Sequence, residues 1–224
     1  MTRETTSVAV AAAVLASVAL GAVAQNATVK IDLVKEGVGR PPADFKFART
    51  GEGNLGQWTV VTDPTAVDGL AIEHVSTDQH EDRYPLAIYQ PLAPENLVAS
   101  TRFKMMSGTM LTAGLALSVR NPDSYYAVSA SVLEQRIDLL LVRNGKVERI
   151  ESASNVNIER NRWHVLKATL DDDHFIVALD NRILFTAYDR GRMKDGRIGL
   201  WTREDNVTRF DQIEIRPLPN TPWQ

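Results

Sequence analysis

The chain contains no cysteine, and this absence limits how its fold can be held together. Without cysteine there are no disulfide bonds, on which small secreted domains usually depend. A chain of 224 residues is long enough to bury one sizeable core and is short for two domains. The sequence therefore predicts one domain that is stabilised mainly by hydrophobic burial.

An excess of positive charge is also missing. Lys and Arg number 25 against 28 Asp and Glu, so the formal charge is −3. Nucleic acids and anionic membrane surfaces attract proteins that present strongly basic patches. We therefore expect no nucleic-acid partner.

Segments with a helical period are absent, and short apolar runs with a period of two take their place between Ala113 and Ile215. Turn signals such as Asn144-Gly145 and Asp180-Asn181 separate these runs. In each run one face is apolar, as expected when two sheets pack over a shared core. The pattern predicts an all-β fold, a two-sheet antiparallel jelly-roll sandwich. We expect Trp58, Trp163 and Trp201 to belong to its core.

Residues 1–24 have the pattern of a secretory signal peptide: Arg3, an uncharged run from Val8 to Leu20, and the small residues Ala22 and Ala24. The alternative is a retained membrane anchor, for which the run is marginal in length. We expect cleavage before Gln25, export to the periplasm or the extracellular space, and no membrane span afterwards. The predicted organisation is then a lead-in at 25–43 with a strand at 28–34, a jelly-roll domain at 44–217 and a proline-rich tail at 218–224.

Short connections predict that four strands, at 96–106, 111–120, 124–132 and 136–143, are consecutive neighbours in one sheet. Their outward side chains would then form a continuous platform of basic, hydroxyl and aromatic groups. Sugars suit such a surface, because their hydroxyls form hydrogen bonds and their C–H faces pack on aromatic rings. The alternative is a solvated outer face that keeps the sheet soluble. The predicted ligand-binding residues are Arg102, Arg120, Tyr125, Ser129 and Arg136.

Several motifs follow one another in an order that is similar to a known group: Tyr125-Tyr126-Ala127-Val128, Val142-Arg143-Asn144-Gly145, Trp163-His164-Val165-Leu166 and Gly199-Leu200-Trp201-Thr202. The array resembles secreted bacterial jelly-roll domains of the concanavalin A-like lectin/glucanase type. Among these domains, the array is similar to the group related to 3-keto-disaccharide hydrolases, which is also described as family-16 glycoside hydrolase-like or LamG-like. The resemblance runs from Trp58 to Pro217.

The resemblance implies a carbohydrate-binding or interaction module without catalytic activity, whose partner is a glycan or another cell-surface component. The alternative that it implies is a glycoside hydrolase or lyase acting on 3-keto-disaccharides or related glycosides. A hydrolase needs two carboxylates across the scissile bond. The Glu-x-Asp-x-x-Glu motif of family-16 glucanases is absent, and the acidic pair nearest the platform is Glu134 and Asp138. These two are the candidate catalytic residues, and the alternative for them is a loop residue and a surface charge paired with Arg136.

The resemblance also implies a structural calcium ion near the chain ends, for which Asp44 and Asp211 are the candidate ligands. The alternative is that both aspartates cap turns. The four histidines contain no closely spaced pair of the kind that binds metal, and His164 fits a structural role at the start of a strand.

Overall fold

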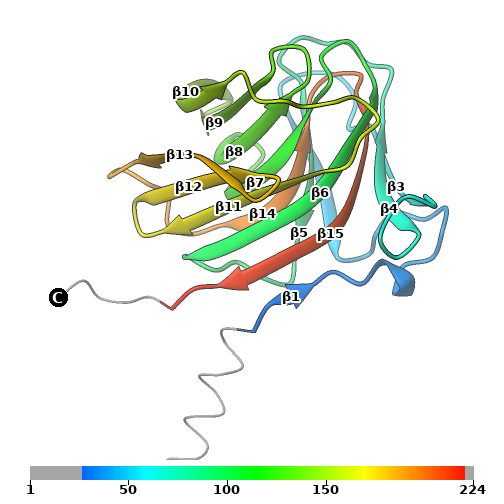
Figure 1. Ribbon diagram of the computed structural model, residues 1–224, viewed down its shortest axis with the longest axis horizontal. Coiled ribbons are helices and arrows are strands. Elements are labelled where there is room, and N and C mark those ends of the chain that lie inside the picture. The colour runs from blue at the N-terminus through cyan, green and yellow to red at the C-terminus, as the bar shows by residue number, and fades with distance from the viewer. Residues whose placement is uncertain (1–26, 220–224) are drawn as a thin grey trace, which may run out of the picture.

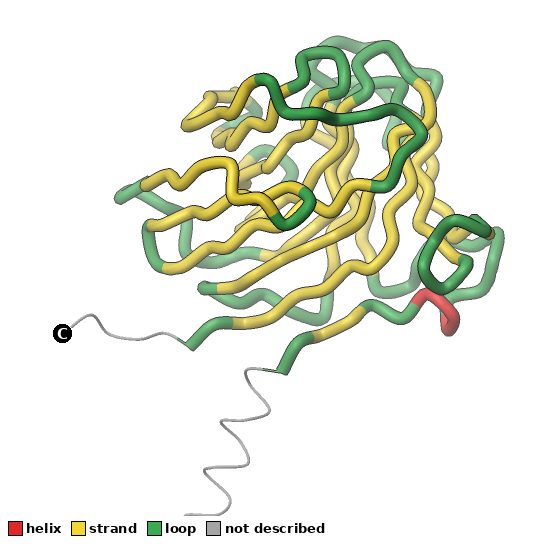
Figure 2. Tube along the Cα trace, viewed as in Figure 1, coloured by secondary structure: helices red, strands yellow, loops and turns green. Residues whose placement is uncertain are grey.

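A computed structural model of the chain describes residues 27–219. The predicted signal peptide at 1–24 and the last five residues of the predicted tail lie outside the described residues. Within residues 27–219 the chain forms fifteen strands and one short 3-10 helix, η1. Figure 2 colours the strands yellow and the helix red. The predicted all-β fold is confirmed.

The described strands form two antiparallel sheets that pack face to face (Figure 1). The eight-stranded sheet, called sheet A, has the order β13-β12-β11-β6-β15-β4-β3, with β1 paired to β15. The seven-stranded sheet, called sheet B, has the order β10-β9-β8-β7-β14-β5-β2. The strands of sheet A are β1 (Val29–Lys30), β3 (Gln57–Thr62), β4 (Leu70–Val75), β6 (Leu97–Ser107), β11 (His164–Asp171), β12 (His174–Leu179), β13 (Arg182–Tyr188) and β15 (Val207–Pro217). Those of sheet B are β2 (Phe45–Thr50), β5 (Tyr84–Tyr89), β7 (Thr112–Asn121), β8 (Ser124–Ser131), β9 (Arg136–Arg143), β10 (Lys146–Ser154) and β14 (Arg197–Thr202).

The turn signals of the sequence lie where the chain reverses. Asn144-Gly145 joins β9 to β10, and Asp180-Asn181 joins β12 to β13. Both residues of each pair have a positive φ, which is the conformation that a two-residue hairpin turn requires. The predicted strand at 28–34 is shorter than expected, because the Asp32 carboxylate accepts a hydrogen bond from the Val34 N–H and starts η1 (Leu33–Lys35).

The main core lies between the sheets and takes one face of each strand. Tyr126 and Leu139 of sheet B meet Phe103 and Phe175 of sheet A in this cluster. The rings of Tyr126 and Phe175 are 5.0 Å apart and tilted, a favourable geometry for aromatic pairs. The alternation of apolar residues in the sequence identified this inner face correctly.

The connection from β6 to β7 crosses from sheet A to sheet B, so the prediction that 96–106 belongs with the three following strands is wrong. The crossing is held by Asn206, whose amide accepts from the Leu111 N–H and donates to the Thr112 carbonyl. Gly108 lies against this amide with a φ of +131°, and a Cβ there would be 2.3 Å from the Asn206 Oδ1. Arg102 on β6 is therefore on a different sheet from Tyr125 and Arg136.

Sheet B is strongly curled toward its outer face. Four strand spacings separate β2 from β8, which is about 19 Å across a flat sheet. Nevertheless the Thr50 hydroxyl at the end of β2 is 2.7 Å from the Tyr125 hydroxyl on β8. Only a curled sheet brings these atoms together.

The hollow of the curl is filled by a second apolar cluster, which includes Tyr84, Leu86, Tyr125 and Trp201. Tyr125 is 0% exposed, so its predicted role as an exposed sugar platform is wrong. The Trp201 indole N–H donates to the Tyr125 hydroxyl at 3.3 Å, and the Thr50 hydroxyl donates to the Pro122 carbonyl. Because Thr50 has used its only proton, Tyr125 donates to Thr50. Burial raises the pKa of Tyr125 to about 12.

Candidate functional site

Arg120 is a third predicted ligand-binding residue that does not lie on the predicted platform, because β7 contains a β-bulge. Ser118 has a φ of +49°, and the pairing of β7 with both neighbours shifts register there. A bulge inverts the alternation of side chains. Val119 therefore joins the second apolar cluster, and Arg120 extends away to Asp195, with its Nε 2.6 Å from the Asp195 Oδ1.

The remaining predicted residues do lie together, on the outer face of β8, β9 and the loop between them. Arg136 Nε is 2.8 and 2.9 Å from the two oxygens of Asp138, and its terminal nitrogen is 2.5 Å from Glu134. Arg149 on β10 approaches Asp138 at 2.9 Å, and Ser129 is paired across the strands with Asp138. Burial acts against the charge of Arg136, but its bonds to Asp138 and Glu134 hold its pKa above the usual value.

The charged groups of this ion-pair cluster, Glu134, Arg136, Asp138 and Arg149, are paired with one another. Ser129 and Asp138 are buried, and a single guanidinium holds both candidate catalytic carboxylates. A glycosidase needs one carboxyl group that is free to donate a proton and a second that faces the substrate. The geometry instead matches the alternative, in which these acids are paired with Arg136. Catalysis by Glu134 and Asp138 stays a prediction without structural support.

The calcium prediction does not fit the residues present. Asp44 is exposed just before β2 of sheet B, whereas Asp211 is buried on β15 of sheet A. Asp211 accepts from the Val67 N–H at 2.9 Å and from Arg102 at 3.1 Å, while burial raises its pKa above the usual value. Within residues 27–219, no three His, Cys, Asp or Glu side chains are grouped so that they could hold a metal ion. Calcium normally takes six to eight oxygen ligands, and no such group of carboxylates surrounds either aspartate in the described part of the chain.

Trp163 is the one predicted core tryptophan of three that lies outside the core. Its half-buried ring covers Arg102 and Lys104 on the outer face of sheet A, with the guanidinium carbon 4.8 Å and the Lys104 Nζ 4.7 Å from the ring centre. Its N–H donates to the Thr65 hydroxyl at 2.9 Å. Arg102 thus serves a cation–π and ion-pair network. Trp58 and Trp201 are buried, as predicted.

Two buried histidines have structural roles. His164 accepts from the Glu159 N–H through Nε2, so its Nδ1 carries the proton that is donated to Asp180 at 2.8 Å. His74 is fully buried, with Nδ1 2.8 Å from the Asn206 carbonyl. Burial first, and then the charge of Arg83, lower the pKa of His74 to about 4, so the ring is neutral near pH 7.

A groove at one edge of the sandwich has the features of a ligand site that the predicted platform lacks. It lies between the end of β10 with its following loop and the β12–β13 hairpin, and its volume is about 490 Å³. That volume is within the range of small-molecule pockets. We call it the serine–asparagine groove; its lining residues are Ser152, Ala153, Ser154, Asn155, Val156, Asn157, Leu179, Asp180, Arg182 and Leu184.

Side-chain hydrogen bonds hold both walls of this groove in place. Gln135 holds the loop after β10, because its amide donates to the Val132 and Ile158 carbonyls at 2.7 Å and accepts from the Ile158 N–H. Asn155 has a φ of +58°, a conformation that asparagine tolerates well. On the opposite wall, the Asp180 carboxylate is committed to the His164 ring and the Val165 N–H.

The rim of the groove carries polar side chains that are not committed elsewhere. Within the described part of the chain, the side chains of Ser152, Ser154, Asn155 and Arg182 form no hydrogen bond or ion pair with protein. The floor between them is apolar, formed by residues such as Val156 and Leu179. Free donors and acceptors around an apolar floor can bind a ligand that has hydroxyl groups and C–H faces. The run of hydroxyl and amide residues at 152–157 was the sequence signal for this groove, but only the fold brings it opposite Arg182.

No helix among the described residues is long and apolar enough to cross a membrane. No protein-family profile matches the chain. No curated protein sequence matches it either.

Solved structures do share the fold. A carbohydrate-binding module, CBM66 from Bacillus subtilis, is 16% identical with a TM-score of 0.60, over 76% of this chain and 94% of that one. The cellulose induced protein Cip1 is 10% identical with a TM-score of 0.60, over 86% and 97%. Domain 4 of AbnA, a GH43 extracellular arabinanase from Geobacillus stearothermophilus solved with arabinotriose, is 11% identical with a TM-score of 0.55, over 86% and 91%. At these identities the likeness establishes a concanavalin A-like jelly-roll sandwich and nothing finer.

Proposed function

We propose that the protein is an exported carbohydrate-binding module that holds a glycan in the serine–asparagine groove and does not cleave it. The observation that carries the proposal is the set of uncommitted hydroxyl, amide and guanidinium groups around the apolar floor of the groove. The carbohydrate-binding module and the arabinanase domain with the same fold support this class of ligand. The ion-paired state of Glu134 and Asp138 supports a role without catalysis.

The test is binding of the mature chain to cellulose, xylan, arabinan, levan and β-1,3-glucan, followed by calorimetry with soluble fragments of whichever bind. Arg182→Met removes the guanidinium from the rim but keeps the length of the side chain. Hydrogen bonds to charged groups contribute about 1.5–3 kcal/mol, so the affinity is expected to fall by about tenfold or more. Asn155→Gly removes the amide and keeps the positive φ, and should weaken binding several-fold.

The matched control is Arg216→Met, the same change at an exposed position of β15 on sheet A. It should leave binding unchanged. Failure of the folded protein to bind any of these glycans would refute the proposed function. Binding that survives Arg182→Met but is lost in Arg136→Met would move the site to the ion-pair cluster. Turnover of a 3-keto-glucoside that is lost in Glu134→Gln would support the hydrolase alternative instead.

Export is part of the same proposal, because a module for extracellular or periplasmic glycans has to leave the cytoplasm. It is tested by expressing the full chain in a bacterial host and sequencing the N-terminus of the protein from the periplasm and the medium. A mature N-terminus at Gln25 is expected. Retention of residues 1–24 in a membrane fraction would favour the anchor.

A further inference from the structure

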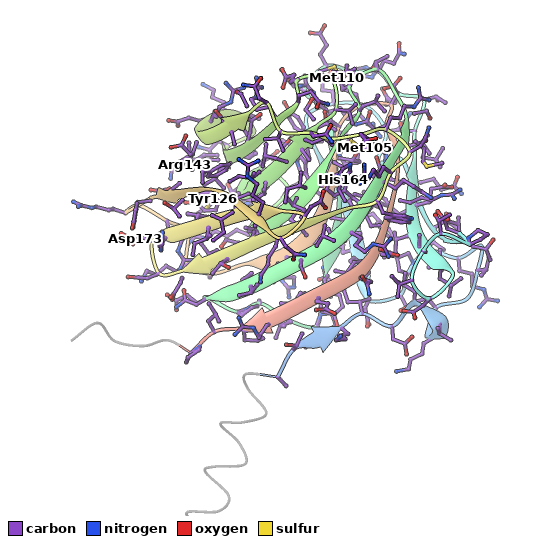
Figure 3. All side chains as sticks on the ribbon, viewed as in Figure 1. Met105, Met110, Tyr126, Arg143, His164 and Asp173 are labelled. Atoms are coloured by element: carbon purple, nitrogen blue, oxygen red, sulfur yellow. The ribbon has the colours of Figure 1, made fainter. Side chains whose placement is uncertain are left out.

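A second hollow lies on the same edge of the sandwich as the serine–asparagine groove. β10 is the last strand of sheet B and β13 is the last strand of sheet A, and Figure 1 shows them on the same side of the molecule. The second hollow has a volume of about 430 Å³, and we call it the tyrosine pocket. Its lining residues are Leu141, Arg143, Glu148, Arg149, Ile150, Tyr188, Asp189 and Gly191. Figure 3 shows Arg143 on this side of the molecule.

The two hollows are the opposite ends of one seam. The first half of β10 and the end of β13 line the tyrosine pocket, whereas the end of β10 and the start of β13 line the serine–asparagine groove. From Glu148 to Ser154 is six residues of strand, or about 20 Å at about 3.3 Å per residue. A ligand that fills both hollows along this length must therefore be an extended chain.

The tyrosine pocket offers an aromatic ring that is held in place. Tyr188 is 65% exposed, and its ring is stacked on His174 with the centroids 4.5 Å apart and the planes at 6°. One face of the ring is thus covered, and the exposed remainder is a flat surface for the C–H groups of a sugar. Near it, the side chains of Arg143 and Glu148 form no hydrogen bond or ion pair with residues 27–219.

Charges along the seam balance. Arg143 and Arg149 accompany Glu148 and Asp189 in the tyrosine pocket, and Arg182 and Asp180 line the same wall of the groove. Neither hollow presents a surplus of one sign, which favours an uncharged ligand over an anionic or a cationic one.

From these observations we infer that the seam binds one linear neutral oligosaccharide across both hollows, with one sugar in the serine–asparagine groove and another stacked on Tyr188. The inference rests on the proposed function and adds the size and charge class of the ligand. A short sugar would fill one hollow only. A longer chain would gain the second contact without a second association step, so its affinity should be higher.

The test is calorimetry of the mature chain with cellohexaose, xylohexaose and arabinohexaose, each against its own disaccharide, and with hexagalacturonic acid as the anionic probe. At least one neutral hexasaccharide is expected to bind tenfold or more tightly than its disaccharide. Tyr188→Ala should remove most of that gain and leave disaccharide binding unchanged, whereas Asn155→Gly should weaken both. Ile183→Ala, at another exposed apolar position of β13, is the control that should change neither.

Equal affinity for hexasaccharide and disaccharide, or an unchanged hexasaccharide affinity in Tyr188→Ala, would overturn the inference and leave the proposed function standing. Tighter binding of hexagalacturonic acid would overturn its neutral-ligand part. No binding of any sugar would overturn both proposals.

Discussion

Tyr125→Phe is the sharpest test of the curled sheet. The hydroxyl of Tyr125 accepts from the Trp201 N–H at 3.3 Å and donates to Thr50 at 2.7 Å, in an interior where the residue is fully buried. Removing it leaves the indole N–H buried without an acceptor, while Thr50 keeps its own bond to the Pro122 carbonyl. One unsatisfied buried donor costs about 1–3 kcal/mol, so we expect the free energy of unfolding to fall by about 2 kcal/mol.

The measurement is urea unfolding followed by tryptophan fluorescence, with the slope on denaturant expected to stay constant. In a thermal scan the same loss corresponds to a fall in Tm of about 4–8 °C for a domain of this size. Tyr188→Phe makes the same change on an exposed ring and should stay within about 0.5 kcal/mol of the parent chain. If Tyr125→Phe also leaves the free energy of unfolding within about 0.5 kcal/mol of the parent chain, Tyr125 is solvated. The contact between the end of β2 and β8 would then be wrong.

Two further predictions concern stability near His74. The folded chain lowers the pKa of this ring from 6.5 to about 4, so the unfolded state takes up the proton first. The contribution of neutral His74 to the free energy of unfolding is complete above pH 6.5 and is lost as the pH falls toward 4, by up to about 3 kcal/mol. Urea titrations at several pH values should show that this loss is reduced in His74→Gln. Gly56→Ala would place a Cβ 2.1 Å from the His74 Nε2 at a φ of +73°, whereas Gly69→Ala meets no atom within 4 Å at a similar φ of +69°. We expect urea unfolding to show a loss of about 1 kcal/mol for Gly69→Ala and at least 2 kcal/mol more for Gly56→Ala, and equal losses would contradict the packing around His74.

The sequence predicted the elements well because their signals are local. Alternation assigned the inner faces of β8 and β9, and the pairs Asn144-Gly145 and Asp180-Asn181 located two hairpins. These features depend on residues that are neighbours in the chain, so no knowledge of the remaining fold was needed.

The errors arose where distant residues decide the outcome. A short connection favours adjacent strands, but Asn206, almost 100 residues away, turns the β6–β7 connection across the sandwich. The bulge at Ser118 inverts the face of Arg120, and the curl of sheet B covers Tyr125. Alternation cannot distinguish an outer face that is exposed from one that is rolled around a second core.

The serine–asparagine groove was missed for a related reason. Its two walls come from the end of β10 and from the β12–β13 hairpin, which are far apart in the sequence and become neighbours only where the edges of the two sheets meet. The free state of Ser154, Asn155 and Arg182 is also a property of the folded chain, because it depends on which partners lie within reach.

The most direct test of the central claim is an amide NMR titration of the mature chain with the tightest-binding of the three hexasaccharides. We expect the shifted amides to lie at 148–157 and 179–191, along both walls of the seam. Shifts centred on Glu134, Arg136 and Asp138, with the seam unchanged, would show that the ligand binds the outer face of sheet B and would contradict this account.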